Sequence, residues 1–175
     1  PVAGDLVAGQ AFLKWLTPFV WRKNLDFAAI QDIHSIKRQI NAQRGGTGIS
    51  LPGHNVKLGR GGIREIEFFA QTQQLIWGGR LAQLRLSRTE ETLRQLTECE
   101  QIEASVCDDM IAAYRYLRRV EHRLQMIEDK QTHSLPEDDD KLAAIATFLG
   151  YDTIEALAGE LTSHLENVEA HYAGL

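Results

Sequence analysis

The chain has 175 residues, of which 43% are hydrophobic and 25% are charged, a size and composition that fit one globular domain with a real core. Its net charge of -5 argues against broad electrostatic binding of nucleic acid, and no apolar run approaches the roughly 18 residues of a membrane span. The two cysteines, Cys99 and Cys107, form no CxxC pair, so they predict neither a disulfide framework nor a zinc site and favour a reduced, cytoplasmic setting.

The N-terminal part of the chain predicts two helices. Asp5 is a typical helix-capping residue, and the apolar residues after it have helical spacing, although Pro18 should kink or split this first helix. The second helix is expected over residues 26–44, with Gly45 as its C-terminal stop. The chain starts without a methionine and stops inside a helical pattern, so we interpret it as a piece of a longer protein.

Residues 45–62 form a glycine-rich loop that holds seven of the fourteen glycines in the chain. Its VKL stretch is short enough for a strand or an extended arm. Lys57, Arg60 and Arg64 lie within eight residues of sequence. The next helix is expected to begin at Ile63, where unpaired N–H groups and positive potential suit a phosphate. The loop is therefore a candidate anion site.

Two interpretations of this loop stay open from the residues alone. Phosphate-loop and dinucleotide patterns both fail, because no Gly-Lys-Ser/Thr follows and GxGxxG lacks its third glycine. The loop either contacts a phosphate or wraps its own domain with its cations in solvent. The candidates for contact with a phosphate or nucleotide are Lys57, Arg60, Gly61, Gly62, Arg64 and Glu65.

From Ile63 onward the chain predicts one helix after another. The first of them should end at Gly78, and the SRTE stretch at 87–90 resembles a capping box that opens a short helix. The strongest pattern alternates apolar spacings of four and three over residues 106–127. Such a continuous apolar seam is typical of a long helix that packs against other helices in a bundle.

The C-terminal end predicts further helices and completes the fold class. Pro136 fits a first-turn position, the acidic residues after it suit the positive end of a helix, and Gly150 should end that helix. The last helix is expected behind Asp152. The sequence therefore predicts an all-α fold, an antiparallel bundle of about six helices in a single domain over residues 1–175, with one glycine-rich excursion at 45–62.

Two groups of charged side chains resemble sites, and each has a simpler interpretation. Glu65 and Glu67 are two apart on a predicted helix, so they should point to different sides, with Glu65 as a partner of the positive helix end. His122 and four arginines line the polar side of the long helix, where they either grip a phosphate or a partner's carboxylates, or pair with nearby acidic residues as a solvated face. These arginines are Arg115, Arg118, Arg119 and Arg123.

Three separated stretches resemble one known family, in the same order along the chain. They are FVWRKNLDFAAI at 19–30, NVKLGRGGIREIEFFAQ at 55–71 and YRYLRRVEHRLQMIEDKQTHSLP at 114–136. All three are similar to the glutamine synthetase adenylyltransferases/deadenylylases, and GGIREIEF is more like their N-terminal half, which removes AMP. The resemblance covers nearly the whole chain.

The resemblance implies the architecture and reactions of a parent enzyme. The family has two nucleotidyltransferase domains of the polymerase-β type, each followed by a helical domain, and this chain resembles the first helical domain. One half of the parent removes AMP from glutamine synthetase by phosphorolysis, and the other half adds AMP from ATP, in the regulation of nitrogen metabolism. The implied partners are glutamine synthetase, the PII signal protein and the missing nucleotidyltransferase domain, with no nucleic acid and no membrane.

The resemblance also implies Mg²⁺ and ATP, ADP or phosphate as cofactors of the parent enzyme. The family holds its metal on carboxylates in a Gly-Ser…Asp-x-Asp pattern, which this sequence lacks. The chain alone is therefore expected to be inactive, with no catalytic residue and no metal ligand, and to frame the active-site cleft with its loop. Two alternatives are a protein-interaction bundle with the loop as a docking arm, and the helical domain of a related uridylyltransferase, which GGIREIEF disfavours.

Overall fold

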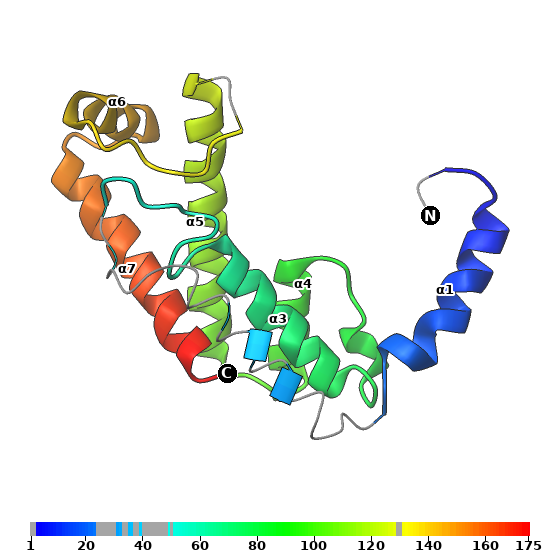
Figure 1. Cartoon of the computed structure of the whole chain (residues 1–175). Helices are drawn as coiled ribbons and strands as arrows, with labels where there is room; N and C mark the ends of the chain where they lie inside the picture. Colours follow the sequence, from blue (N-terminus) through cyan, green and yellow to red (C-terminus); the bar gives the residue numbers. More distant parts are fainter. Residues whose placement is uncertain are drawn as a thin grey trace.

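The computed structural model of the chain describes residues 3–23, 31–32, 35–36, 39, 49, 51–128 and 131–175. The elements assigned in these residues are α1 (Leu6–Val20), α3 (Ile63–Trp77), the 3-10 helix η1 (Ala82–Leu84), α4 (Thr89–Glu98), α5 (Ala104–Glu128), α6 (Asp139–Leu149) and α7 (Ile154–Ala173). In the described residues the only strand-like pairing is an isolated antiparallel bridge between Asn55 and Ser134, outside these helices. The predicted all-α class is therefore confirmed, and six α-helices are present in the described part (Figure 1).

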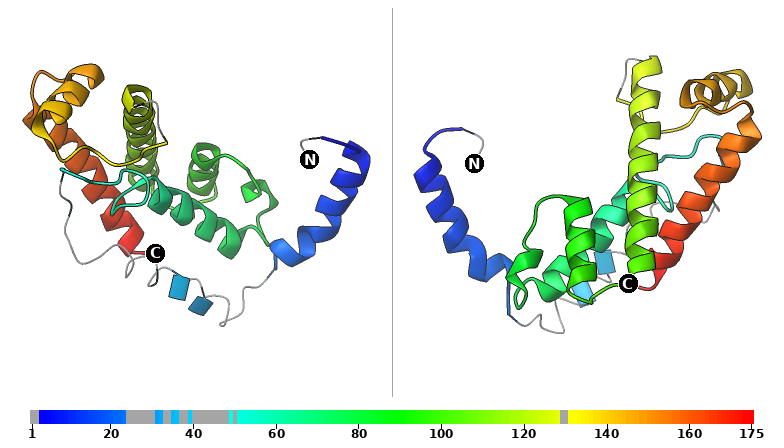
Figure 2. Two further views of the ribbon diagram at one scale, coloured as in Figure 1. Left: turned by 45° about the horizontal axis from the view of Figure 1, so that its top comes forward. Right: turned by 180° about the vertical axis from the view of Figure 1, so that it is seen from behind.

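The long helix α5 is the centre of the bundle. It packs against α3, α4, α6 and α7, and α7 runs beside it in the opposite direction (Figure 1). The other views place α6 across one end of this pair and α4 beside α3 at the other end (Figure 2). The predicted antiparallel packing is thus present between the two longest helices, and the loop before α3 reaches both of them.

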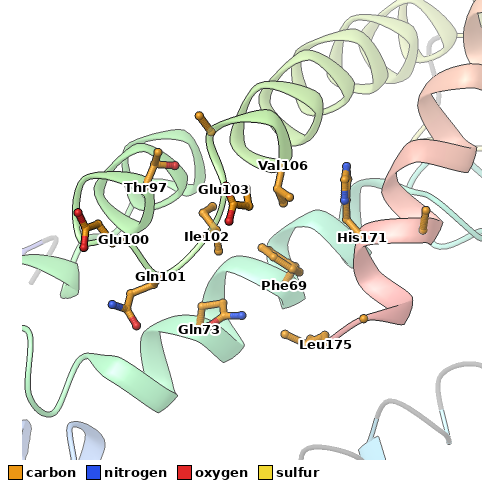
Figure 3. A pocket seen from close by; sticks show the side chains of 13 residues that line it. Phe69, Gln73, Thr97, Glu100, Gln101, Ile102, Glu103, Val106, His171 and Leu175 are labelled. Atoms are coloured by element: carbon orange, nitrogen blue, oxygen red, sulfur yellow. The ribbon is translucent and has the colours of Figure 1, made fainter.

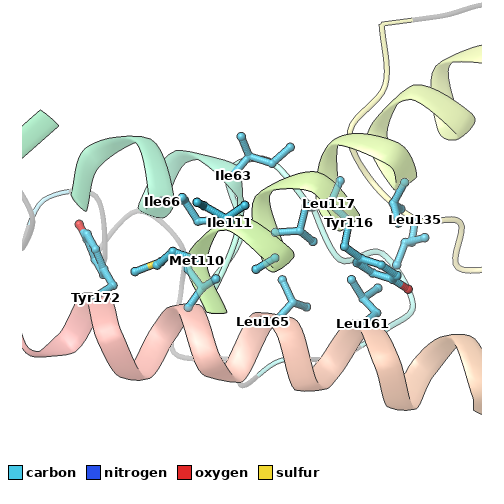
Figure 4. Close-up of a cluster of buried hydrophobic side chains, with 14 of the residues drawn as sticks. Ile63, Ile66, Met110, Ile111, Tyr116, Leu117, Leu135, Leu161, Leu165 and Tyr172 are labelled. Atoms are coloured by element: carbon cyan, nitrogen blue, oxygen red, sulfur yellow. The ribbon is translucent and has the colours of Figure 1, made fainter. Parts of the chain in front are cut away.

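The core lies where α3, α5 and α7 meet. Ile66 from α3, Leu117 from α5 and Leu165 from α7 are each at most 1% exposed, and Figure 4 shows the side chains from the three helices interleaved. The predicted apolar seam of α5 is confirmed over its middle turns, which are buried. It does not reach its predicted end, because Ile127 is 47% exposed.

Two of the predicted helix caps are present in the structure. The Asp5 carboxylate accepts hydrogen bonds from the N–H groups of Val7 and Ala8, at 2.9 and 3.0 Å, and caps α1 as predicted. Gly150 ends α6 in the left-handed conformation, with φ of 93°. This is a position where glycine carries no penalty from a Cβ atom.

Two helix starts differ from the predictions by one to three residues, and the last helix begins behind Asp152 as predicted but with another cap. The residue before α4 is Arg88, and no side chain caps that helix, so the capping box at 87–90 does not form. Pro136 precedes the first turn of α6, which Asp138 caps by accepting from the Lys141 N–H at 3.0 Å. Thr153 rather than Asp152 caps α7, because its hydroxyl reaches the Ala156 N–H at 3.1 Å.

The N-terminal helix α1 stands apart from the bundle (Figures 1 and 2). It runs through Pro18 without a break, so of the kink or split expected there the split is absent, and none of its residues is buried. The predicted second helix, residues 26–44, falls largely outside the described residues. Among the helices described, none alone is long and apolar enough to cross a membrane, and the pair α6 and α7, bent by 74°, passes that test only when taken together.

Candidate functional site

The loop before α3 is a series of turns fastened to the segment after α5. The Asn55 side chain accepts hydrogen bonds from the N–H groups of Lys57 and Leu58, at 3.1 and 2.8 Å. Next to the bridge at Asn55, the Val56 N–H donates to the His133 carbonyl at 2.9 Å. The expected strand or arm at VKL is therefore wrong, because the Asn55 side chain binds the backbone that a strand would use and closes a turn.

The positive end of α3 is closed by carbonyl groups of this same loop. The N–H of Ile63 donates to the Val56 carbonyl and that of Arg64 to the Lys57 carbonyl, both at 3.0 Å. The N–H of Glu65 donates to the Gly62 carbonyl at 2.9 Å. These are the groups that an anion at a helix start would use. A phosphate at this loop would accordingly have to be held by side chains.

The two candidate glycines allow the loop backbone to pack closely. Gly61 has φ of 69°, and a Cβ atom on it would overlap the carbonyl of Leu165 in α7. A Cβ atom on Gly62 would lie 2.9 Å from the carbonyl oxygens of Val56, Lys57 and Gly59. Packing of the loop therefore explains both glycines without a ligand.

The three candidate cations, two in the loop and one in the first turn of α3, pair with three different helices. The Lys57 ammonium lies 3.4 Å from Glu121 of α5, and the Arg60 guanidinium lies 3.3 Å from Glu169 of α7. Arg64 pairs with Glu67 on α3 itself, at 3.0 Å, and its side chain is 57% exposed. The structure thus places Lys57, Arg60 and Arg64 around the start of α3, but their charged groups do not meet at one point.

Glu65 and Glu67 point to different sides of α3, as predicted. Glu65 is 2% exposed, and its carboxylate accepts the Gly61 N–H at 2.9 Å, which ties the loop to the first turn of the helix. Glu67 lies at the surface with Arg64. The pair therefore shares no ligand.

Glu121 of α5 is a buried carboxylate, whereas the acidic partners of the α5 arginines were expected on a solvated face. It is 1% exposed, and it accepts a hydrogen bond from Arg118 at 2.6 Å. Its other oxygen lies 3.4 Å from the Lys57 ammonium and 3.0 Å from Nδ1 of His133. One carboxylate thus joins the loop, α5 and the segment after α5. The sequence did contain a signal, because position 121 follows Leu117 by four residues on the apolar face of α5.

The arginines of α5 are held in two ways. Arg115 binds Glu90 of α4 through two nitrogens, at 2.6 and 3.0 Å, and Arg118 binds Glu121. The bond to Arg115 lowers the pKa of Glu90 and raises that of Arg115. Arg119 and Arg123 stack on aromatic rings. These side chains line an open hollow of about 670 Å³ on the outer side of α5.

A second polar cluster lies between α5 and α7. The Tyr151 hydroxyl donates to the Tyr116 hydroxyl at 3.1 Å, and the Tyr116 ring packs on His164 with a centroid distance of 4.6 Å. Burial raises the pKa of Tyr116 and Tyr151 and lowers that of His164, because the uncharged forms are favoured away from water. The cluster lies within the helix pair rather than at the loop.

Another hollow, of about 680 Å³, opens where α3, the α4–α5 connection and the end of α7 meet (Figure 3). Phe69 and Gln73 line it from α3, and His171 and Leu175 from the C-terminal end. His171 also lies 2.9 Å from Asp109 of α5. In the part of the chain that the structure describes, no three side chains of His, Cys, Asp or Glu come close enough to hold a metal ion.

Comparisons with known proteins find relatives of the chain over its whole length. The model of the family described as GlnD PII-uridylyltransferase matches residues 34–175. Proteins named bifunctional glutamine synthetase adenylyltransferase/adenylyl-removing enzyme match all 175 residues, at 57% identity in Xanthobacter autotrophicus and in Rhizobium meliloti and 56% in Agrobacterium fabrum. The chain spans 18% of the length of each of these relatives.

Proposed function

Because this chain belongs to the family described as GlnD PII-uridylyltransferase, we propose that it is a helical domain of a bifunctional glutamine synthetase adenylyltransferase/adenylyl-removing enzyme. The observation that carries this proposal is the 57% identity over the whole chain to relatives of that name. The same observation favours this parent over a uridylyltransferase, which the name of the family model would also allow. We place the chain in the half that removes AMP, on the resemblance of GGIREIEF.

In this proposal the parent cleaves the bond between AMP and a tyrosine of glutamine synthetase. An oxygen of phosphate attacks the phosphorus, the bond to the tyrosine oxygen breaks, ADP forms, and the tyrosine oxygen takes up a proton. Mg²⁺ on the nucleotidyltransferase domain would neutralise the phosphate oxygens. Since the described residues gather no metal-binding group, no step of the reaction is assigned to a metal on this chain.

The contribution of this chain would be a fixed wall of the cleft. The loop is fastened by the buried carboxylates Glu65 and Glu121, which bind Gly61 and Lys57. Arg60 and Arg64, with side chains 38% and 57% exposed, remain at the surface beside the start of α3. Groups held in place before the reaction stabilise developing charge without reorganising. This arrangement supports Arg60 and Arg64 as contacts for a phosphate brought by the missing domain.

The further partners follow from the same proposal. Glutamine synthetase would be the protein substrate, ATP would serve the AMP-adding half, and the PII signal protein would regulate both in the cytoplasm. Changing the loop should then alter one reaction of the parent more than the other.

Arg64→Ala in the full-length enzyme tests the loop. We expect the rate of AMP removal to fall at least tenfold, about 1.4 kcal/mol of transition-state stabilisation, while AMP addition is kept. The melting temperature should hardly change, because Arg64 is exposed and its ion pair with Glu67 lies on the surface of the same helix. Arg60→Ala should act in the same direction but more weakly. Steady-state rates in both directions and a melting curve for each variant decide the outcome.

Arg88→Ala is the matched control, because Arg88 is also an exposed arginine paired with a glutamate three residues on, at 3.2 Å. It should leave both rates unchanged. Unchanged AMP removal in Arg64→Ala would contradict a role for the loop in the reaction. Equal loss of both activities would point instead to impaired binding of glutamine synthetase.

A second candidate function is a protein-interaction module. The exposed apolar side chains of α1 favour it, since Phe12, Trp15 and Phe19 are 56%, 73% and 69% exposed. An interaction role predicts that changes in α1 weaken the affinity for glutamine synthetase and leave the turnover number unchanged. A role in the cleft predicts the opposite for changes in the loop.

A further inference from the structure

The outer side of α5 carries a concentration of positive charge in a chain of net charge -5. An open hollow of about 670 Å³ lies there, and we call it the α5 arginine groove. Its lining includes Arg115, Arg118, Arg119, Arg123, His122 and Met126. In Figures 1 and 2 the C-terminal half of α5 extends beyond α3 and α4.

The arginines of the groove are fixed by specific contacts. Arg115 is bound by Glu90 and Arg118 by the buried Glu121. The guanidinium carbon of Arg119 lies 5.3 Å from the centre of the Tyr116 ring, and that of Arg123 lies 4.5 Å from the centre of the Phe148 ring. A guanidinium that stacks on a ring uses its face and keeps its N–H edge for another acceptor. The side chains of Arg119 and Arg123 are therefore fixed in place and still have N–H groups that can donate to a ligand.

The charge of these two arginines is not neutralised by the residues that the structure describes. No carboxylate of that part of the chain lies within ion-pair distance of Arg119 or Arg123, whereas Arg115 and Arg118 each have one. Arg119 and Arg123 are four residues apart on one helix, so their stems lie about 6 Å apart on the same face. A compact group with several anionic oxygens can bridge two guanidinium groups at that spacing.

We propose that the α5 arginine groove binds a phosphoryl-bearing small molecule, with Arg119 and Arg123 donating to its phosphate oxygens. Its volume lies in the range of about 300–1,000 Å³ that small-molecule sites occupy. Tyr114 and Met126, which also line it, offer a surface for an attached base or sugar. The net charge of the chain disfavours nucleic acid, which needs an extended basic surface. This site is separate from the loop and does not depend on the proposed parent reaction.

Calorimetric titration of the 175-residue chain with ADP, ATP and inorganic phosphate tests the proposal. We expect ADP and ATP to bind with a Kd of about 0.1–1 mM. Arg119→Ala and Arg123→Ala should each weaken this binding at least tenfold, and Arg88→Ala, outside the groove, should leave it within a factor of two. Binding of phosphate as tight as that of ADP would identify free phosphate as the ligand, and tighter binding of ADP would identify a nucleotide.

Controls make the outcome decisive. Melting curves should be nearly the same for all variants, because Arg119 is exposed and Arg123 is only partly buried. The proposal is overturned if ADP, ATP and phosphate all fail to bind at millimolar concentration, or if their binding survives both substitutions. It is also overturned if Arg60→Ala and Arg64→Ala abolish binding while Arg119→Ala does not, since the site would then be the loop. Binding of a hexaglutamate peptide alone would identify an acidic protein segment as the ligand instead.

Discussion

At the scale of single residues, the buried carboxylate of Glu121 has the largest effect on the position of the loop at the candidate site. A carboxylate that is 1% exposed is stable as an anion only if charged or polar groups surround it, and here Arg118, Lys57 and His133 do so. Lys57 belongs to the loop and His133 to the segment after α5. The position of the loop therefore depends on one side chain of α5.

Glu121→Gln should destabilise the chain and loosen the loop. The amide keeps the shape of the carboxylate but removes the charge that faces Arg118 and Lys57. Both partners are partly exposed and can turn to water, so we expect a loss of about 1–3 kcal/mol in the free energy of unfolding. Urea unfolding measures it, and Glu166→Gln, at an exposed position of α7, is the control that should stay unchanged. Equal stability of the two variants would contradict a central role for Glu121.

Residue types in the loop could be predicted from the sequence, but the partners of the side chains could not. Lys57, Arg60 and Arg64 are cations beside a helix start, and the structure places them there. The carboxylate partners of Lys57 and Arg60, which are Glu121 and Glu169, are 64 and 109 residues away in sequence. No local pattern encodes such a pairing, because it depends on how α5 and α7 pack around the loop.

At the scale of elements, the backbone of the loop at Gly61 packs directly against the backbone of α7 at Leu165. Gly61→Ala should therefore be severely destabilising. A non-glycine residue with positive φ costs roughly 1–2 kcal/mol, and overlap of the new methyl group with the Leu165 carbonyl adds to this loss. The free energy of unfolding by urea is the measurement.

Gly159→Ala is the matched change for this prediction, because nothing lies within 4 Å of a Cβ atom at that position of α7. It should stabilise the chain by about 0.5–1 kcal/mol, since alanine is the better helix former. Destabilisation by both changes would mean that the packing of the loop is not what Gly61 provides.

Because His164 lies at the contact between α5 and α7, we expect the free energy of unfolding to depend on pH. His164 faces Tyr116 and Arg119, with Glu160 and Asp109 as the nearby acids, and burial lowers its pKa below the ordinary value of 6.5. The unfolded chain therefore binds a proton at higher pH than the folded chain does. The contribution of His164 is complete above pH 6.5 and is lost as the pH falls through the lowered pKa.

His164→Phe should remove this part of the pH dependence, because phenylalanine keeps a ring against Tyr116 but does not titrate. The measurement is the midpoint of urea unfolding between neutral and mildly acidic pH, compared with the original chain. Asn167→Phe, at an exposed position of α7, serves as the control, because asparagine does not titrate, and it should leave the dependence as it is. An unchanged slope in His164→Phe would contradict the assignment.

Helices with a continuous apolar face could be predicted well, whereas helix starts could not. The middle of α5 is buried as its seam of spacings predicts, since the period of 3.6 residues directly reports a buried face. Caps depend on single hydrogen bonds, and several polar residues compete for each one. Asp152 and Thr153 are both capping residues, and only Thr153 caps α7.

At the scale of the whole molecule, α1 differs from every other helix in its packing. It has an apolar face like a core helix, but no residue of it is buried. The bundle begins to meet this end of the chain at Trp21, whose ring lies 5.9 Å from the Arg85 guanidinium. Burial of apolar surface is the main source of folding free energy, so a helix without a buried residue contributes little to the stability of the bundle.

Deletion of residues 1–20 should accordingly change the free energy of unfolding by less than about 0.5 kcal/mol. Leu117→Asp gives the opposite extreme, because Leu117 is 0% exposed and an unpaired buried charge costs several kcal/mol, against a total stability of about 5–15 kcal/mol. Urea unfolding followed by circular dichroism compares the two. The truncated chain should unfold at nearly the original midpoint, and Leu117→Asp should be largely unfolded without urea. A strongly destabilised truncated chain would show that α1 packs against the bundle in solution.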